Sequence, residues 1–280
     1  MINIILNTFG KYHRQDVAME GLQYLMKRYN GKIQVYDIQF PNTTSLYPNV
    51  ICKNSLRNTK EIVGGEKNHP FVCDLFNAGL DLSEDTQAQG FIVMNSDVIL
   101  LPKMIDYLLE KKPKAMAFCR TDIEDVENFE ELLTKGAKFV RTEIAGCDIF
   151  YFDREWASKF SIFFQSSYLY GKPLFDNVWV GYIKVLGDNS PIGNDIPPYA
   201  VHIHHGISSV TTECEEKRWN ERILDMNKTD HIVHNIVFYH LKKNLLRRDW
   251  GTFLNPTPNE KEFEKEFFDI INIHTENKIP

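Results

Sequence analysis

The chain has 280 residues and a formal net charge of −6, from 32 basic and 38 acidic side chains. Hydrophobic residues make up 43% and charged residues 25%, a globular composition that excludes collagen, coiled-coil and wholly disordered chains. Nucleic-acid binders usually carry a basic face, so the acidic balance argues against that class of partner. The sequence contains no apolar run near the ~18 residues that a transmembrane segment requires.

The five cysteines are widely spaced and include no C-x-x-C pair, which argues against a zinc centre or a disulfide framework. Free thiols are typical of a reducing compartment, so we expect a cytoplasmic protein. Aromatic residues make up 12% of the chain, which favours a β-containing core or a site that stacks flat ligands.

The first forty residues predict a strand–helix–strand unit. Residues 2–6 form a short apolar run that ends in a polar turn. Ala18, Leu22 and Leu25 then recur at helical spacing, and residues 33–38 alternate as a strand does. Such a βαβ unit implies a parallel sheet with a right-handed crossover.

The later elements follow from apolar runs and from prolines that open or end helices. In chain order we expect a helix from Pro70, a central strand at 90–94, an apolar stretch at 98–101, a helix from Pro102, a strand at 114–118, a solvated acidic helix at 122–131, one or two strands at 138–152 broken at Ala145-Gly146, a loop at 187–198 and a short strand at 199–206. Thr229 or Asp230 is expected to cap a long helix, and a charged helix is expected at 259–272. The predicted fold class is α/β, with a mostly parallel central sheet flanked by helices. We expect a domain at 1–210 and a helical C-terminal cap at 211–280 packed on it.

Three polar clusters stand where strands are expected to end. They are Asn7-Thr8-Phe9, Asn95-Ser96-Asp97 and Arg120-Thr121-Asp122. In an open parallel sheet, ligands bind at the carboxyl ends of the strands. A diphosphate ligand with a divalent metal suits such an edge, because Mg²⁺ and Mn²⁺ take oxygen ligands from carboxylates and phosphates.

The run from Gly90 to Pro102 resembles the segment of GT-A, family 2-like glycosyltransferases in which the central strand ends in Asp-x-Asp or a degenerate x-x-Asp. Residues 70–80 resemble the helix near the donor in such enzymes, and Asn7-Thr8-Phe9 resembles their first strand end, which meets the nucleoside. The resemblance covers about residues 1–185. It implies a nucleotide-binding α/β domain, a sugar-nucleotide donor and Mn²⁺ or Mg²⁺.

The resemblance implies a donor site and a metal site. The donor-binding residues would be Asn7, Thr8, Phe9, Lys67, Asp74, Asn95, Ser96 and Asp97. Asn95 stands where the family has the first Asp, so one carboxylate is missing and Asp97 alone remains. His202 or His204 would complete the metal site, because the two share one face of a strand while His205 points away. The alternatives are an Asx turn at 95–97 and hydrogen-bonded structural histidines.

A transferase that inverts the anomeric carbon needs a base, and a carboxylate in the cleft is the natural choice. Asp176, in Phe175-Asp-Asn-Val-Trp179, resembles the late acidic motif that supplies this base, and Trp179 would bind the acceptor sugar. Asp148 is the rival base. The alternatives are an N-cap at Asp176, a core Trp179 and an Asp148 paired with Arg or Lys.

The implied function is a hexosyltransferase-type glycosyltransferase that moves a sugar from a nucleotide-diphosphate donor to a hydroxyl of a glycan or another acceptor. Attachment to the inner face of the membrane is expected only if the acceptor is lipid-linked. Three alternatives stay open: a sugar-phosphate nucleotidyltransferase, a metal-dependent hydrolase built on His202-x-His-His205, and a non-catalytic nucleotide- or glycan-binding module. The first is less favoured because its Gly-rich loop would be reduced to Gly10.

Overall fold

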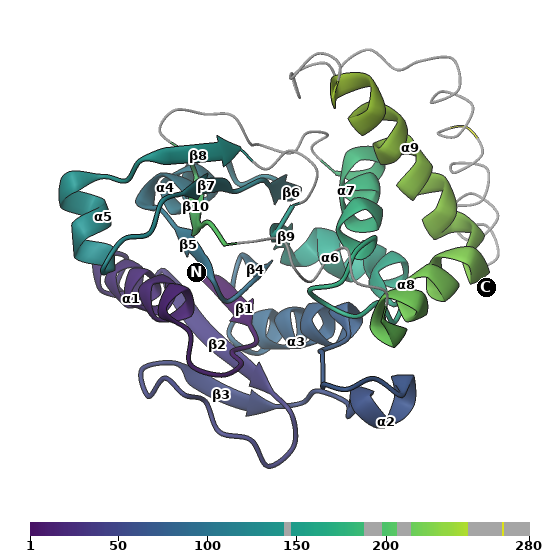
Figure 1. Cartoon of the computed structure of the whole chain (residues 1–280), viewed down its shortest axis with the longest axis horizontal. Coiled ribbons are helices and arrows are strands. Elements are labelled where there is room, and N and C mark those ends of the chain that lie inside the picture. Colours follow the sequence, from purple (N-terminus) through teal and green to yellow (C-terminus); the bar gives the residue numbers. More distant parts are fainter. Residues whose placement is uncertain (143–146, 188–197, 206–213, 246–264, 266–280) are drawn as a thin grey trace.

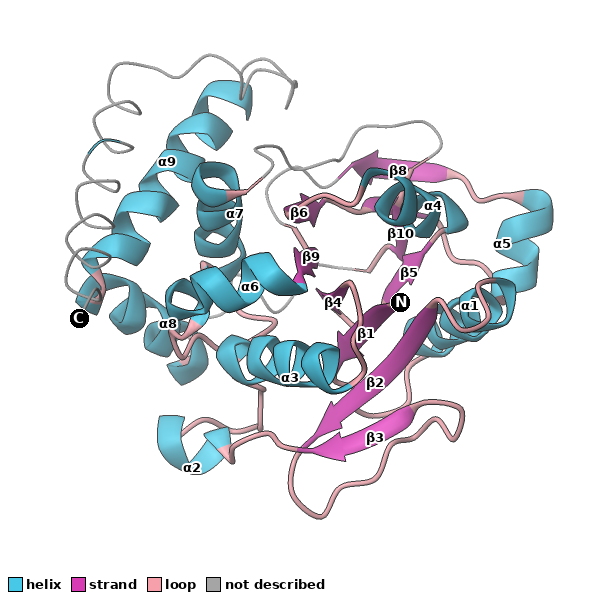
Figure 2. Cartoon of the chain, turned by 180° about the vertical axis from the view of Figure 1, so that it is seen from behind, coloured by secondary structure: helices cyan, strands magenta, loops and turns pink. Residues whose placement is uncertain are grey.

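The computed structural model describes residues 1–142, 147–187, 198–205, 214–245 and 265. Ten strands form two mixed sheets within this part of the chain. The helices lie on both sides of the larger sheet (Figures 1 and 2). The protein is therefore of the α/β class.

The larger sheet is mixed. Its strands run in the order β3 (Ile51–Asn54), β2 (Ile33–Gln39), β1 (Ile2–Leu6), β4 (Gly90–Met94), β9 (Ile149–Asp153) and β6 (Ala115–Phe118). The pairs from β3 to β4 are parallel, but β9 is antiparallel to both β4 and β6. The prediction of a mostly parallel sheet is therefore wrong for the part of the sheet formed by β4, β9 and β6. Strands β4 and β6 run in the same direction, are connected through a helix, and leave one strand position between them. Strand β9 occupies this position and, because it is antiparallel to both neighbours, needs no crossover connection.

The smaller sheet has the order β5 (Val98–Leu100), β10 (Ala200–Ile203), β7 (Thr121–Ile123) and β8 (Phe139–Thr142). Strand β10 is antiparallel to β5 and parallel to β7. Only residues 95–97 separate β4 from β5, and only residues 119–120 separate β6 from β7. Both polar segments therefore lie at the junction of the two sheets.

The part of the chain that the structure describes contains nine α-helices and one 3₁₀ turn. They are α1 (His13–Arg28), α2 (Thr59–Val63), α3 (Val72–Asp85), α4 (Pro102–Lys111), α5 (Phe129–Lys135), α6 (Arg154–Phe160), the 3₁₀ turn η1 (Ser161–Phe164), α7 (Phe175–Leu186), α8 (Glu215–Met226) and α9 (Lys228–Leu245). One core cluster joins α1 and α4 to the sheet through Leu22 and Ile105. A second cluster joins α3, α7 and α9 through Phe76, Trp179 and Val233.

Most elements expected from periodicity are present. The βαβ unit is confirmed by the parallel register of β1 with β2, and Pro102 occupies the first turn of α4. The acidic helix expected at 122–131 is wrong, since β7 occupies the start of this stretch and α5 begins only at Phe129. Asn128 caps α5, because its side chain accepts a hydrogen bond from the backbone N–H of Glu131.

The cap expected for the long helix is also wrong. The side-chain oxygen of Asn227 accepts hydrogen bonds, each 3.1 Å long, from the backbone N–H groups of Thr229 and Asp230. Neither of these two residues is therefore the cap. The inward residues Ile232 and Val233 are buried, as the spacing predicts. The charged helix expected at 259–272, most of the loop at 187–198 and the break at 145–146 lie outside the described residues.

The division at residue 210 stays a prediction, although α9 shares one hydrophobic cluster with α7. In the part of the chain that the structure describes, no helix combines the length and hydrophobicity needed to cross a bilayer.

Candidate functional site

The first strand end is fixed to its neighbour β2. The side-chain amide of Asn7 donates to the carbonyl of Ile38 over 2.7 Å. Asp37, completely buried, accepts hydrogen bonds from the backbone and hydroxyl of Thr8 and from the Gln39 amide. The polar groups of Asn7 and Thr8 thus hold the chain in place. Phe9 stands out from this segment with 54% of its surface exposed.

Gln15 ties this strand end to the next one. Its side-chain oxygen accepts hydrogen bonds from the Ser96 hydroxyl (2.9 Å) and the Phe9 backbone N–H (3.2 Å). Its amide nitrogen donates to the Gly10 carbonyl and to the Tyr47 hydroxyl. Because Gln15 is buried, it fixes the loop after β1 against the segment after β4. Helical periodicity carries no signal for this role.

Asp97 is the centre of a cluster of basic side chains. Its Oδ2 lies 2.9 Å from Nε of Arg14, 3.5 Å from Nε2 of His202 and 3.8 Å from Nε2 of His205. The two imidazole rings are 5.0 Å apart. One carboxylate oxygen thus faces one guanidinium group and two imidazoles.

A second carboxylate, that of Asp122, lies behind the histidines. It is completely buried and faces Nδ1 of His202 at 3.0 Å, Nδ1 of His204 at 3.3 Å and Nε of Arg120 at 3.1 Å. The prediction that His204 joins His202 at Asp97 while His205 points away is therefore wrong. Strand β10 ends at Ile203, so the alternation of side chains no longer governs residues 204 and 205.

Asp148 is the third carboxylate of this cluster. One of its oxygens accepts from the side-chain amide of Asn95, and the other pairs with Arg120. Arg120 thus bridges Asp148 on one side and Asp122 on the other. This pairing is the structural alternative weighed for Asp148, and it leaves neither oxygen without a partner.

The charges of the cluster alter its acid–base properties. Burial alone would raise the pKa of Asp97, but hydrogen bonds with His202, His205 and Arg14 hold it well below its usual range. Burial would lower the pKa of His202, yet its bonds to Asp122 and Asp97 raise it. Three carboxylates and two guanidinium groups give the cluster a net charge of −1 when the imidazoles are neutral.

The donor set of Asp97, His202 and His205 fits a divalent metal. One ligand atom from each residue lies within 4.8 Å of the other two, the spacing that a metal ion can bridge. Two imidazoles and one carboxylate suit Mn²⁺, Fe²⁺ or Zn²⁺ better than Mg²⁺, which prefers oxygen ligands alone. The Nδ1 atom of His202 faces Asp122, as is usual for a metal-bound histidine.

The remaining predicted site residues lie elsewhere or have other roles. Trp179 is 1% exposed and packs edge-on against Phe150 and Phe152, so it belongs to the core and cannot bind an acceptor. Asp74, in the first turn of α3, forms an ion pair with Arg57. Lys67 is exposed on the loop after α2, which is tethered to α8 through the bond from Glu66 to Glu216.

Asp176 lies in the first turn of α7 and is half-buried. The pKa of Cys147 is raised by a hydrogen bond with Cys119, by burial and by the charges of Asp176 and Asp148. The preceding residue, Phe175, packs against Phe150 with ring centres 6.2 Å apart, so Asp176 lies near the end of β9 that follows Asp148.

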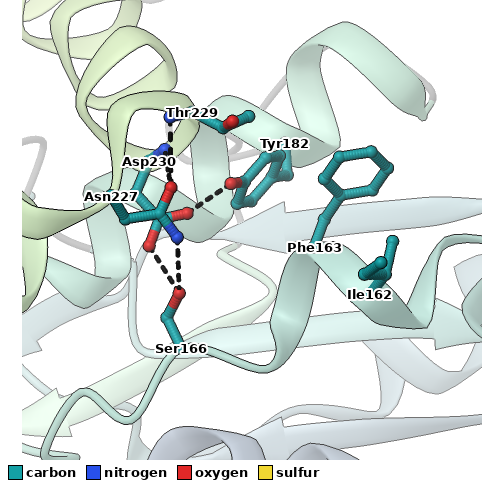
Figure 3. Close-up of a pocket in the computed structure, with 7 residues that line it drawn as sticks. All are labelled: Ile162, Phe163, Ser166, Tyr182, Asn227, Thr229 and Asp230. Atoms are coloured by element: carbon teal, nitrogen blue, oxygen red, sulfur yellow. Dashed lines mark hydrogen bonds between the residues drawn. The ribbon is translucent and has the colours of Figure 1, made fainter. Parts of the chain in front are cut away.

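A separate pocket lies between α7, η1 and the start of α9 (Figure 3). Its carboxylate, Asp230, is completely buried and accepts hydrogen bonds from Ser166 at 2.6 Å, Tyr168 at 3.1 Å and Tyr182. These three hydroxyls satisfy both oxygens of Asp230. The hydrogen bonds of Asp230 in this pocket thus connect α9 to α7.

No protein-family model matches this sequence, and no curated protein matches it either. Among solved structures the fold is similar to that of PcManGT, a mannosyltransferase from Pyrobaculum calidifontis in complex with GDP-Man and Mn²⁺, at 11% identity and a TM-score of 0.41. That likeness covers 95% of this chain and 69% of that one. A second similar structure is that of a glycosyltransferase involved in the glycosylation of the major capsid of PBCV-1, at 10% identity and a TM-score of 0.37. This likeness covers 81% of this chain and 99% of that one. Similarity at this level fixes neither family nor substrate.

Proposed function

We propose that the chain is a glycosyltransferase that moves a sugar from a nucleotide-diphosphate donor to a hydroxyl of a glycan or another acceptor. One observation carries the proposal: the Asp97, His202 and His205 set stands beside Arg14 where the parallel strands β1 and β4 end. A departing nucleoside diphosphate develops negative charge, and a metal ion with a guanidinium group stabilises such charge.

The metal would be held by Asp97, His202 and His205, and the two imidazole ligands favour a transition-metal ion such as Mn²⁺ over Mg²⁺. When bound, it supplies positive charge for the diphosphate of the donor. Asp122 keeps His202 in the orientation that turns Nε2 towards Asp97. Arg120 pairs with both Asp122 and Asp148, which reduces the repulsion between these carboxylates and the diphosphate.

The nucleoside would meet the loop after β1. The rings of Phe9 and Tyr12 are 5.7 Å apart, and both side chains are largely exposed, at 54% and 43%. Exposed aromatic faces are suited to stacking on a base, which contributes about 1–3 kcal/mol. Asn7 and Thr8 support this loop rather than contact the donor with their polar side chains.

Asp176 is the proposed base for an inverting transfer. It would accept the proton of the acceptor hydroxyl while the diphosphate leaves. Asp148 is a weaker candidate because both of its oxygens already accept hydrogen bonds from Asn95 and Arg120.

A non-catalytic nucleotide-binding module is the second candidate, and the Arg14–Asp97 ion pair favours it. In such a protein the guanidinium group would replace the metal permanently. Nucleotide binding without turnover would then be expected.

The test combines binding with turnover. The melting temperature is measured with UDP-, GDP- and dTDP-sugars, with and without Mn²⁺, and release of nucleoside diphosphate is followed by chromatography. Ligand at 100 times its Kd stabilises the folded state by about 2.7 kcal/mol, which a thermal shift detects. Variant Asp97→Asn removes the central carboxylate, and Asp81→Asn, at an exposed position of α3, is the matched control.

The transferase proposal expects Mn²⁺-dependent stabilisation and turnover with one nucleotide class, both lost in Asp97→Asn and retained in Asp81→Asn. Stabilisation without turnover in the wild type would favour the binding module. A failure of every sugar nucleotide to bind would refute both.

A further inference from the structure

Arg14 binds the Asp97 oxygen that faces both imidazoles. Its Nε is 2.9 Å from Oδ2 of Asp97, the same atom that Nε2 of His202 and of His205 approach at 3.5 and 3.8 Å. The guanidinium group and a metal ion are both cations. They therefore compete for one carboxylate oxygen.

Arg14 is also held in a way that permits release. Its backbone is in the first turn of α1, where the N–H of Asp16 donates to the carbonyl of Tyr12 over 3.0 Å. Its side chain is 28% exposed and passes over the Tyr12 ring, with the guanidinium carbon 5.3 Å from the ring centre. Among the described residues, Asp97 is the single hydrogen-bond acceptor of this guanidinium group. Breaking one ion pair is thus sufficient to free it.

Arg120 offers the contrast. It is 19% exposed and lies between two carboxylates, those of Asp122 and Asp148. Releasing it would leave two buried negative charges without a cation, which is strongly unfavourable. Of the two arginines, Arg14 is therefore the one free to change its partner.

The charge balance points in the same direction. With neutral imidazoles the cluster carries a net charge of −1 when Arg14 is in place and −2 when it is not. A divalent metal matches the second value. Arg14 released next to the metal would be attracted by the anionic diphosphate of a donor, for which its planar fork of N–H groups is suited.

We propose that Arg14 couples metal binding to donor binding: its guanidinium group holds the metal's place on Asp97 until the donor arrives, and then binds the diphosphate. The inference rests on the proposed function and deepens it. It makes Arg14 the cation that balances the charge of Asp97 in the metal-free, donor-free site. It also makes the metal and the nucleoside diphosphate bind better together than alone, as reciprocal coupling requires.

The test separates the two steps with variants of Arg14 in the full-length chain. Binding of Mn²⁺ without nucleotide is measured from the EPR signal of the free ion. Binding of UDP, GDP and dTDP, and of the parent nucleosides, is measured by titration calorimetry at saturating Mn²⁺. Arg14→Gln removes the charge, and Arg14→Lys keeps it. Arg28→Gln, at an exposed position about 21 Å along the same helix, changes the net charge equally and is the control.

We expect Arg14→Gln to bind Mn²⁺ at least 10-fold more tightly than the wild type, because the competing cation is gone. The same variant should bind the nucleoside diphosphate at least 10-fold more weakly, with binding of the nucleoside unchanged. The affinities of Arg14→Lys for Mn²⁺ and for the nucleoside diphosphate should lie between those of the wild type and Arg14→Gln. Arg28→Gln should match the wild type. Melting temperatures show whether each variant is folded, and if Arg14→Gln is not, the Arg14→Lys comparison decides.

Unchanged or weaker Mn²⁺ binding in Arg14→Gln would overturn the proposal, because Arg14 would then only position Asp97. Tighter Mn²⁺ binding with unchanged diphosphate binding would also overturn it, while leaving the proposed function intact. Tighter Mn²⁺ binding with no diphosphate binding in any protein, the wild type included, would overturn the proposed function together with the coupling.

Discussion

Replacing Asp122 with Asn tests the carboxylate on which the whole cluster depends. This side chain is completely buried and faces His202 at 3.0 Å, Arg120 at 3.1 Å and His204 at 3.3 Å. Removing one partner of a buried ion pair costs about 3–5 kcal/mol. Arg120 keeps Asp148, and Asn keeps one acceptor oxygen, so the lower end applies. We expect Asp122→Asn to lower the free energy of unfolding by about 3 kcal/mol.

The assay is urea unfolding of the metal-free protein, with Mn²⁺ binding measured in parallel. Loss of the group behind a metal-bound histidine weakens metal affinity by roughly 10–100-fold. Asp125→Asn is the matched control, since Asp125 is 73% exposed and pairs only with His13 among the described residues. A loss of stability below about 1 kcal/mol in Asp122→Asn, or an equal loss in Asp125→Asn, would refute the reasoning.

Three further predictions concern the base, the helix packing and a buried histidine. Asp176→Asn should lower turnover by roughly 100-fold or more without changing donor affinity, as seen by nucleoside diphosphate release and calorimetry; equal turnover would exclude Asp176 as the base. Gly181→Ala should destabilise the protein by about 1–3 kcal/mol in urea, although Ala favours helices, because its Cβ would lie 2.5 Å from the Val233 carbonyl; a more stable variant would contradict this packing. Burial lowers the pKa of His69 to about 4, so the unfolded state binds more protons between pH 6.5 and 4 and wild-type stability falls as the pH drops through this window. His69→Gln should reduce this loss by roughly 2–3 kcal/mol in urea unfolding at each pH, and parallel curves for the two proteins would rule it out.

The sequence predicted the elements whose signal is local. Apolar runs and a helix pattern place β1, α1 and β2, and a proline marks the start of α4. The position of β9 in the sheet depends on where the other strands pair, and these strands come from distant parts of the sequence. No local pattern therefore indicates that β9 runs antiparallel between β4 and β6.

The candidate site was predictable only in part, for the same reason. The resemblance pairs Asp97 with His202, and the structure places these two side chains 3.5 Å apart, while their role in a metal site stays a prediction. Arg14 and Gln15 lie in a helix and look like ordinary helical polar residues, so nothing in the sequence signals that they face residues 96 and 97. His205 was misplaced because the strand ends two residues before it.

Trp179 shows the opposite error. Aromatic residues near an acidic residue suit a sugar-binding surface, but α7 is apolar on nearly every side and is buried accordingly. The sequence does not reveal this, because the covering helix α9 lies more than forty residues further along the chain.

The three residues from Asn95 to Asp97 connect β4 to β5. Each of their side chains contacts a different part of the molecule. Asn95 reaches β9's end of the larger sheet through Asp148, Ser96 reaches α1 through Gln15, and Asp97 faces β10 in the smaller sheet. Neither sheet alone thus contains the cluster. The geometry of the cluster depends on the angle between the two sheets. A ligand or metal ion that contacts both Asp97 and β10 would therefore hold the two sheets at one angle. Conversely, a core substitution that tilts one sheet would disturb the site without touching any of its residues.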